Sequence, residues 1–286
     1  MLQLQFFFLL TTAAGAETIF NIEGKIALVT GGAQGIGYAT IDALLQAGVR
    51  GVTLVDENVA KGRSTAKSFN AKYGYGRVIF LAADVSNGNI FEDVFKVSLD
   101  HWRGLDIVVN NAGVFNENNR NDTINTNIVG VVHGTMLGFK YMSTAKGGRG
   151  GVIINVSSIA ALTTVYYCPV YSGSKSFVLE LGRALGNPIY YDYNMVRVVT
   201  VCLGLTSTSL TATDHFVSSI SNELTPRLKE AALETFVTSP SQSSKNVGDG
   251  IRDVLEDGSS GSVWVIEDDK PPYEIYFPDR KAMRKN

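Results

Sequence analysis

Short apolar runs alternate with longer segments of helical periodicity along this chain. The apolar runs begin near residues 25, 51, 77, 105, 152 and 196, and a last one covers residues 262–266. Runs of this length are typical of buried strands, and the intervening repeats are typical of helices. Alternation of this kind forms βαβ units with right-handed crossovers. The pattern therefore predicts a doubly wound α/β fold, with a seven-stranded, mostly parallel sheet and helices on both faces.

Composition agrees with a globular protein that has one core. The chain has 286 residues, of which 45% are hydrophobic, and its net charge is -2. We expect residues 17–286 to form a single domain, because open α/β sheets of this length commonly do so. The small net charge argues against nucleic acid as a partner. The two cysteines, Cys168 and Cys202, indicate buried thiols and not a disulfide framework.

The first apolar run, residues 25–30, leads directly into a glycine-rich turn that precedes a helical segment. Glycines allow a ligand to approach the backbone, and a helix N-terminus offers free N–H groups and a partial positive charge. The order of strand, turn and helix favours a site for a dinucleotide pyrophosphate, whereas glycines alone would indicate only a turn. The turn contains Gly31, Gln34, Gly35, Ile36 and Gly37.

The second apolar run ends in Asp56, nineteen residues after Gly37. A carboxylate at this distance can bind both hydroxyls of an adenosine ribose and would repel a 2′-phosphate. The candidate position for a phosphate-binding cation in the turn holds Gln34. These features predict NAD, not NADP, as the cofactor; the alternative is that Asp56 is an ordinary residue at a strand end.

Tyr171 and Lys175 are four residues apart, with Ser158 thirteen residues before Tyr171. On a helix this spacing places both side chains on one face. The Lys175 ammonium would lower the pKa of the phenol from about 10 and make it a usable base. Ser158 could hold a substrate oxygen. Many such pairs are only surface residues, so the interpretation depends on the glycine-rich turn and Asp56.

Taken together, these motifs resemble the short-chain dehydrogenase/reductase family of the single-domain type. The branch that looks most similar contains insect alcohol dehydrogenases and 15-hydroxyprostaglandin dehydrogenase. The resemblance implies a Rossmann fold over about residues 22–270. The motifs that carry it, in family order, are residues 30–37, 84–85 and 110–113, Asn127, Ser158 and residues 171–175.

The resemblance also implies a role for individual residues. Tyr171 would be the acid and base, Lys175 would lower its pKa, Ser158 would bind the substrate oxygen, and Asn127 would fix a water beside Lys175. Ser157 would support the turn, and the reaction needs no metal. The residues implied for NAD binding are Gly31, Gln34, Gly35, Ile36, Gly37, Asp56, Asp84, Val85, Asn111, Ala112, Gly113, Tyr171, Lys175, Gly204, Thr206 and Thr208.

The chain departs from the family pattern at Leu203, where the family usually has proline before Gly204. Proline restricts the backbone, so its loss predicts a less preorganised nicotinamide pocket. Thr208 matches the family threonine that contacts the carboxamide.

The substrate is the least specified part of the prediction. Residues 207–240 are expected to form a lid, although the amphipathic pattern over residues 211–233 equally fits a helix that packs on the core. Tyr166, Tyr167, Cys168 and Pro169 are expected to line the pocket. An aromatic and apolar wall favours an oxidoreductase acting on a hydrophobic alcohol, either secondary or primary such as an isoprenoid alcohol, and its ketone or aldehyde. The alternative is a low-turnover binding or storage protein for a hydrophobic ligand.

The N-terminal residues 1–16 resemble a secretory signal peptide, since residues 2–10 are strongly apolar and Ala14-Gly15-Ala16 resembles a cleavage site. The apolar run is too short to span a membrane. A secreted protein is narrowly favoured, and the alternative is a cytoplasmic enzyme with an apolar arm. In a secreted protein, Asn121 would be a glycosylation site in an exposed loop. The resemblance further implies a homo-oligomer, either a dimer or a tetramer.

Overall fold

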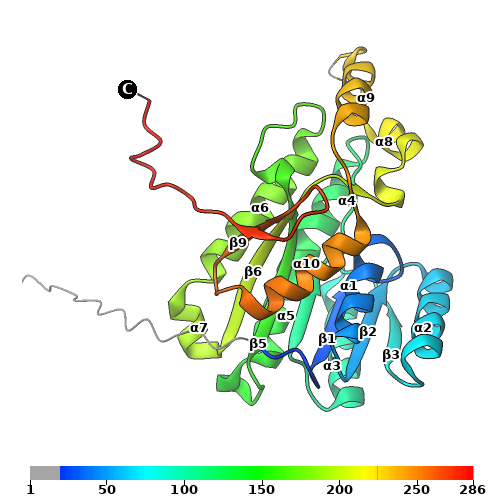
Figure 1. Ribbon diagram of the computed structural model, residues 1–286, viewed down its shortest axis with the longest axis vertical. Helices are drawn as coiled ribbons and strands as arrows, with labels where there is room; N and C mark the ends of the chain where they lie inside the picture. The colour runs from blue at the N-terminus through cyan, green and yellow to red at the C-terminus, as the bar shows by residue number, and fades with distance from the viewer. Residues whose placement is uncertain (1–19, 224, 286) are drawn as a thin grey trace, which may run out of the picture.

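The computed structural model describes residues 20–223 and 225–285, so the predicted signal peptide lies outside the described residues. Its centre is a sheet with the strand order β10-β9-β6-β5-β4-β1-β2-β3 (Figure 1). All neighbouring strands of this sheet pair in parallel except β9 with β10, which confirms the predicted fold class. The strands are β1 (Ile26–Thr30), β2 (Gly51–Asp56), β3 (Val78–Ala82), β4 (Ile107–Asn110), β5 (Gly151–Ser158), β6 (Val196–Leu203), β9 (Val263–Ile266) and β10 (Tyr273–Glu274).

Helices cover both faces of the sheet, and the strands supply side chains to each face in turn. In β1, Ala27 and Val29 join the core on one face, whereas Ile26 and Leu28 join the core on the other. Helices α1, α2 and α10 cover the first face, and α3 and α5 cover the second. The longer helices are α1 (Gly35–Gln46), α2 (Val59–Tyr73), α3 (Gly88–Trp102), α5 (Val131–Met142), α6 (Pro169–Leu185) and α10 (Ser244–Asp257). Within the described ranges, no helix combines the length and the apolar character that a membrane crossing requires.

The sheet has one strand more than the sequence pattern predicted. Strand β10 adds an antiparallel edge beside β9, with Tyr273 opposite Val265 and Glu274 opposite Trp264. This strand has two residues and no apolar run, so periodicity gives no signal for it. The residues that follow, Ile275 and Phe277, pack against the apolar cluster that contains Leu179 and Val263.

The described residues of the range 207–240 form two short α-helices and a 3-10 turn, not one amphipathic helix. Helix α8 (Thr213–Ser219) and helix α9 (Leu228–Thr238) project beyond the carboxyl end of the sheet (Figure 1). A parallel pair of two-residue strands, β7 (Thr206–Ser207) and β8 (Gln242–Ser243), closes the base of this excursion. We call residues 207–240 the lid segment.

The predicted glycosylation site does not lie in a loop. Asn121 is exposed but belongs to the short helix α4 (Arg120–Ile124), and Thr123 of the same sequon is fully buried. The Thr123 hydroxyl donates to the Asn116 carbonyl at 2.9 Å, which fixes the start of the helix. A π-helical turn (Asn125–Gly130) then joins α4 to α5, and the remaining short helix, α7 (Pro188–Asn194), precedes β6.

Candidate functional site

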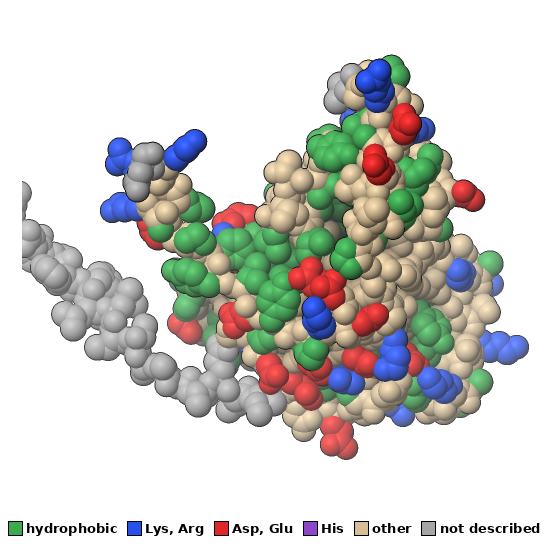
Figure 2. All heavy atoms as spheres, turned by 45° about the horizontal axis from the view of Figure 1, so that its top comes forward, with side chains coloured by type: hydrophobic (Ala, Val, Ile, Leu, Met, Phe, Trp, Pro, Cys, Tyr) green, Lys and Arg blue, Asp and Glu red, His purple; other side chains and the backbone are tan. Residues whose placement is uncertain are grey.

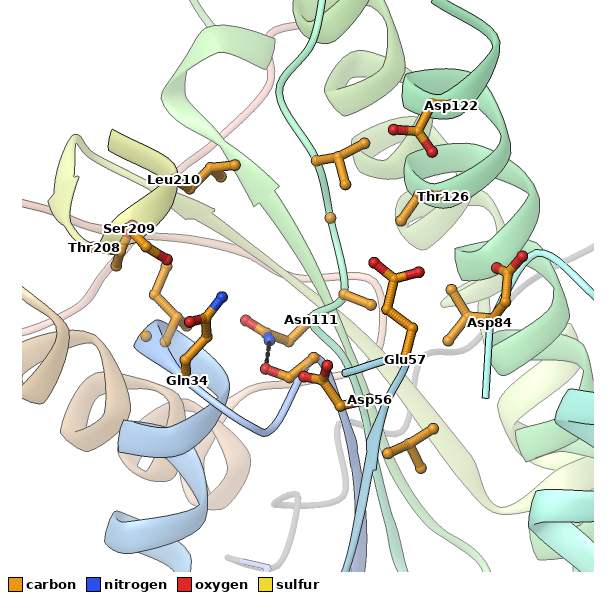
Figure 3. A pocket seen from close by; sticks show the side chains of 18 of the residues that line it. Gln34, Asp56, Glu57, Asp84, Asn111, Asp122, Thr126, Thr208, Ser209 and Leu210 are labelled. Carbon is orange, nitrogen blue, oxygen red and sulfur yellow. Dashed lines mark hydrogen bonds between the residues drawn. The ribbon is translucent and has the colours of Figure 1, made fainter. Parts of the chain in front are cut away.

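A cavity of about 440 Å³ lies beyond the carboxyl ends of β1, β2 and β4. In a doubly wound sheet this is where the strand order reverses and where ligands bind. Gln34 and Thr208 lie on one side of it, Asp84 and Asp122 on the other, and Asn111 and Asp56 between them (Figure 3). The predicted cofactor residues that line it are Gly31, Gln34, Gly35, Ile36, Asp56, Asp84, Val85, Asn111, Ala112, Gly113 and Thr208.

The glycine-rich turn is built so that backbone, not side chains, faces this cavity. Gly31 has φ +63° and Gly35 has φ +56°, values that favour glycine. A Cβ on Gly37 would lie 2.2 Å from the Gly31 carbonyl oxygen. Gly37 does not line the cavity itself; its missing side chain lets the first turn of α1 close onto the end of β1. The helix N-terminus therefore points its free N–H groups toward the cavity, which suits a pyrophosphate.

Asp56 is held in place by two backbone donors. Its carboxylate accepts hydrogen bonds from the Ala33 N–H at 3.0 Å and from the Asn58 N–H at 2.9 Å. Glu57, which the sequence analysis did not single out, adds a second carboxylate to the same wall (Figure 3). Among the described residues that line this cavity there is no Lys or Arg, and Lys61 donates to the Gln34 side chain from α2. This arrangement suits a free ribose and repels a phosphorylated one.

Asn111 joins the turn after β4 to the glycine-rich turn. Its Nδ2 donates to the Thr30 carbonyl at 2.8 Å, and the Thr30 hydroxyl accepts the N–H groups of Asn111 and Ala112, each at 3.0 Å. Asn111 thus lines the predicted cofactor cavity and also links the two turns by hydrogen bonds. On the lid segment, His215 also lines the cavity, although no spacing in the sequence points to it.

A second cavity, of about 400 Å³, meets the first at residues that line both. Its base is formed by Ser158, Tyr171 and Lys175, and its outer walls are largely apolar. The shared residues are Ile36, Asn111, Gly113, Thr208 and Leu210. A dinucleotide in the first cavity can therefore reach a substrate in the second without crossing protein.

Ser158, Tyr171 and Lys175 come together as predicted, but the pKa of Tyr171 moves in the opposite direction. The Ser158 hydroxyl is hydrogen-bonded to Tyr171, and the Lys175 ammonium lies 5.7 Å from the centre of the Tyr171 ring. Burial raises the pKa of Tyr171 to about 12, and the hydrogen bond from Ser158 offsets this only in part. Burial also lowers the pKa of Lys175 to about 8, and its ammonium donates to the Val156 carbonyl at 3.1 Å. The sequence argument gave the Lys175 charge more weight than the loss of solvent.

Asn127 lies in the π-helical turn and is fully buried. Its side chain accepts the Val114 N–H at 2.8 Å and donates to the Val114 carbonyl at 2.9 Å and to the Ser174 hydroxyl at 3.1 Å. Ser174 in turn donates to the Tyr171 carbonyl at 2.7 Å. Asn127 therefore ties the turn after β4 to the helix that carries Tyr171, and its predicted role beside Lys175 stays a prediction. Ser157 donates to the Lys175 carbonyl at 2.8 Å and so supports the same helix.

The backbone that leads into the turn after β6 is held by both neighbouring strands. Leu203 is 5% exposed and pairs with Ser158 of β5 and Ile266 of β9, so both neighbouring strands hold its backbone. The Gly204 N–H donates to the Ile266 carbonyl at 2.9 Å. Gly204 and Thr206 line the second cavity and not the first, and the buried Thr206 hydroxyl donates to the Gly204 carbonyl at 2.9 Å.

Glu117 is a residue of the site that the sequence analysis missed. It is 4% exposed, and its carboxylate accepts the Tyr171 N–H at 2.8 Å and the Val170 N–H at 3.3 Å. These donors belong to the first turn of α6, where N–H groups have no partner within the helix. The Glu117 N–H donates to the Ser219 carbonyl at the end of α8, at 2.9 Å. Nothing in the local sequence signals this role, because the two donors lie more than fifty residues further along the chain.

We expect Glu117→Ala to lower both the stability and the turnover of the protein, because two N–H groups beside Tyr171 would lose their acceptor. Loss of a helix cap typically costs about 1 kcal/mol of stability. A small displacement of Tyr171 should lower kcat by about tenfold or more. Thermal unfolding and kcat, measured well below the unfolding temperature, check the two effects. Glu117→Gln keeps one acceptor oxygen and should recover most of the kcat; equal loss in both variants would contradict the capping role.

The outer walls of the second cavity come from the lid segment and from the residues before α6. Phe216 and Phe236 stack with ring centres 4.0 Å apart, and Phe115 stacks on Phe216 at 5.7 Å. The Tyr166 hydroxyl donates to the Ala231 carbonyl of α9 at 3.0 Å, so the lid segment is attached to the wall. Of the apolar side chains in residues 211–233, Phe216 both packs in this cluster and lines the cavity, whereas Ile220 and Ala232 pack in the cluster without lining it.

The residues predicted to form the wall before α6 divide into two groups. Tyr166, Tyr167 and Cys168 line the cavity, whereas the exposed Pro169 begins helix α6 instead. Cys168 and Cys202 are buried free thiols, as predicted.

Comparison with known proteins gives similarity over nearly the whole chain. A family model for short chain dehydrogenases matches residues 25–215. The 15-hydroxyprostaglandin dehydrogenase (NAD(+)) of Rattus norvegicus is 35% identical over 262 residues, covering 91% of this chain and 96% of that protein. Alcohol dehydrogenase 2 of Ceratitis capitata is 26% identical over 245 residues, covering 86% and 92%. These relatives confirm the predicted family resemblance.

One solved structure with a similar fold is a short chain dehydrogenase/reductase from Burkholderia phymatum in complex with NAD. It superposes with a TM-score of 0.73 at 22% identity and covers 87% of this chain and 90% of that one. At this identity the similarity concerns the fold alone.

Proposed function

Because the chain belongs to the short chain dehydrogenase family, we propose that it is an NAD-dependent oxidoreductase that interconverts a hydrophobic alcohol and its ketone or aldehyde. The observation that carries the proposal is the junction of the two cavities. Ser158, Tyr171 and Lys175 lie at the base of an apolar cavity that opens directly onto the candidate dinucleotide site.

The residues of the first cavity fit NAD. A Cβ on Gly31 would lie 2.9 Å from Asn111 Nδ2, and a Cβ on Gly37 would lie 2.2 Å from the Gly31 carbonyl oxygen, so the turn can close beside Asn111 only with glycine at both positions. The N-terminus of α1 would hold the pyrophosphate, Asp56 the adenosine ribose, and Asp84 and Val85 would border the adenine. NAD, when bound, supplies the acceptor for the hydride.

The protein side of the reaction is a proton transfer in a water-poor cavity. Tyr171, as phenolate, takes the proton of the substrate hydroxyl, and Ser158 hydrogen-bonds the same oxygen. The carbon–hydrogen bond then breaks, and its electron pair leaves as hydride while the carbonyl forms. Because burial raises the pKa of Tyr171 to about 12, the phenolate depends on a nearby positive charge, and Lys175, with a pKa of about 8, is largely protonated at neutral pH.

A substrate screen tests the proposal. The purified protein with NAD is offered aliphatic, isoprenoid, steroid and eicosanoid alcohols, and NADH formation is followed by absorbance. Turnover of one hydrophobic class supports the proposal and identifies the class. NAD binding without turnover of any alcohol would contradict it and favour a binding protein.

Asp56→Ala is expected to reduce the preference for NAD over NADP. The change removes the acceptor for the ribose hydroxyls and the negative charge that repels a 2′-phosphate. Each effect is worth about 1 kcal/mol or more, so the ratio of affinities should fall by about tenfold or more. Titration of both cofactors measures the ratio. Asp56→Asn keeps the size and removes only the charge, so it separates repulsion from the ribose contact; equal affinities in the unchanged protein would refute this account of Asp56.

A further inference from the structure

Two carboxylates, Glu267 and Asp268, line the substrate cavity directly after β9. Glu267 lies against the turn after β6, since a Cβ on Gly204 would come within 2.7 Å of the Glu267 Cβ. The Tyr273 hydroxyl donates to Glu267, and this hydrogen bond raises the pKa of Tyr273 to about 12. Strand β10, through Tyr273, thus helps to hold Glu267 in the wall of the cavity.

Positive charge is scarce around the same cavity. Among the described residues that line it, Lys175 is the one cation, and it is 4% exposed at the base. Lys270 pairs with Asp268 at 3.6 Å, but its side chain is 72% exposed and does not line the cavity. An exposed pair of this kind neutralises a carboxylate only weakly. The stretch from Glu267 to Lys270 contains three carboxylates, since it includes Asp269, and one ammonium. Its net charge is therefore about −2.

The surface around the lid segment combines hydrophobic side chains with carboxylates. Hydrophobic side chains gather on the face between the C-terminal segment and the lobe of α8 and α9, with Asp and Glu side chains beside them (Figure 2). A long apolar ligand would find hydrophobic contacts along the cavity. A charged group that came beside Glu267 and Asp268 would meet carboxylates.

We propose that this cavity selects an uncharged hydrophobic alcohol over one that carries a carboxylate, and that Glu267 and Asp268 impose this selection. The proposal rests on the proposed function and names its substrate class. Likeness to 15-hydroxyprostaglandin dehydrogenases would have pointed the other way, because a prostaglandin is a carboxylic acid. Glu267 is half-buried and Asp268 is exposed, so a carboxylate beside them would meet two like charges at the wall of the cavity, which weakens binding.

A matched pair of substrates tests the selection. The two substrates are 9-hydroxydecanoic acid and methyl 9-hydroxydecanoate, which share the secondary alcohol and differ only in the carboxylate. We expect kcat/KM to be about tenfold or more higher for the ester, the size of effect that like charges near a protein surface produce. In the double variant Glu267→Gln and Asp268→Asn, this ratio should fall toward one through faster turnover of the acid.

Asp100→Asn is the control, since it removes one exposed carboxylate from α3, away from either cavity. It should leave the ratio unchanged. An acid that is used as well as its ester, or a ratio that the double variant does not alter, overturns the proposal.

A binding measurement separates this proposal from the proposed function. Decanoate and decanamide are titrated calorimetrically into the protein with NADH present, and neither requires turnover. Tighter binding of the amide by about tenfold supports the selection even where no alcohol is oxidised, an outcome that would reject the proposed function alone. Equal binding of the two, or tighter binding of decanoate, rejects the selection whatever the enzyme oxidises.

Discussion

Replacing Tyr171 with Phe is expected to abolish alcohol oxidation while NAD binding persists. The change removes one oxygen, the atom that accepts the substrate proton, and leaves the ring that packs edge-on against Phe115 at 5.3 Å. General acid–base catalysis typically contributes about 10²- to 10⁴-fold, so kcat should fall by about a thousandfold. NADH formation at saturating alcohol measures the loss, and a separate titration follows NAD.

Tyr166→Phe is the matched control, because it removes a phenol oxygen from the wall of the same cavity. That oxygen bonds to the Ala231 carbonyl and to the Thr235 hydroxyl, away from the catalytic group. Its loss should change KM more than kcat. If Tyr171→Phe kept a tenth or more of the original kcat, another group would have to be the base. If the unchanged protein had no turnover, the variant would still bind the ligand, as a storage protein would.

Gly37→Ala is expected to remove NAD binding and to destabilise the fold. The added methyl would lie 2.2 Å from the Gly31 carbonyl oxygen and 2.7 Å from Asn111 Nδ2. The first contact is with backbone, so the turn itself would have to move. Forcing extra atoms into a packed region typically costs about 1–3 kcal/mol. Calorimetric titration with NAD and thermal unfolding measure the two effects.

Gly173→Ala provides the opposite case in the catalytic helix. A Cβ at Gly173 meets nothing within 4 Å, and the residue is exposed within α6 between Tyr171 and Lys175. Alanine is a better helix former than glycine by about 0.5–1 kcal/mol, so this variant should be slightly more stable and remain active. Equal NAD affinity in the two variants would contradict the close approach described for the glycine-rich turn.

Strands and their end residues could be read from the sequence because the information is local. A buried parallel strand is a continuous apolar run; Gly31 and Asn111 directly follow one, and Asp56 is the last residue of another. Since the carboxyl ends of parallel strands share one edge of the sheet, their meeting at one cavity follows from topology.

The features that the sequence did not reveal depend on distant partners. Glu117 caps a helix far along the chain, and Glu267 reaches the cavity only because β9 pairs with β6. The pKa of Tyr171 is raised because the walls of the cavity exclude solvent. The spacing of residues in the sequence does not predict how complete this exclusion is. Strand β10 was missed because two residues carry no periodic signal.

Glu117 is bonded to two parts of the protein that have different tasks. Its N–H holds the end of α8, and its carboxylate holds the first turn of α6. If α8 were displaced, it would pull on the same residue that holds the backbone of Tyr171 in position. Access to the cavity and readiness for proton transfer are consequently linked through one side chain. A compound that wedges α8 outward could inhibit the enzyme without touching the catalytic groups.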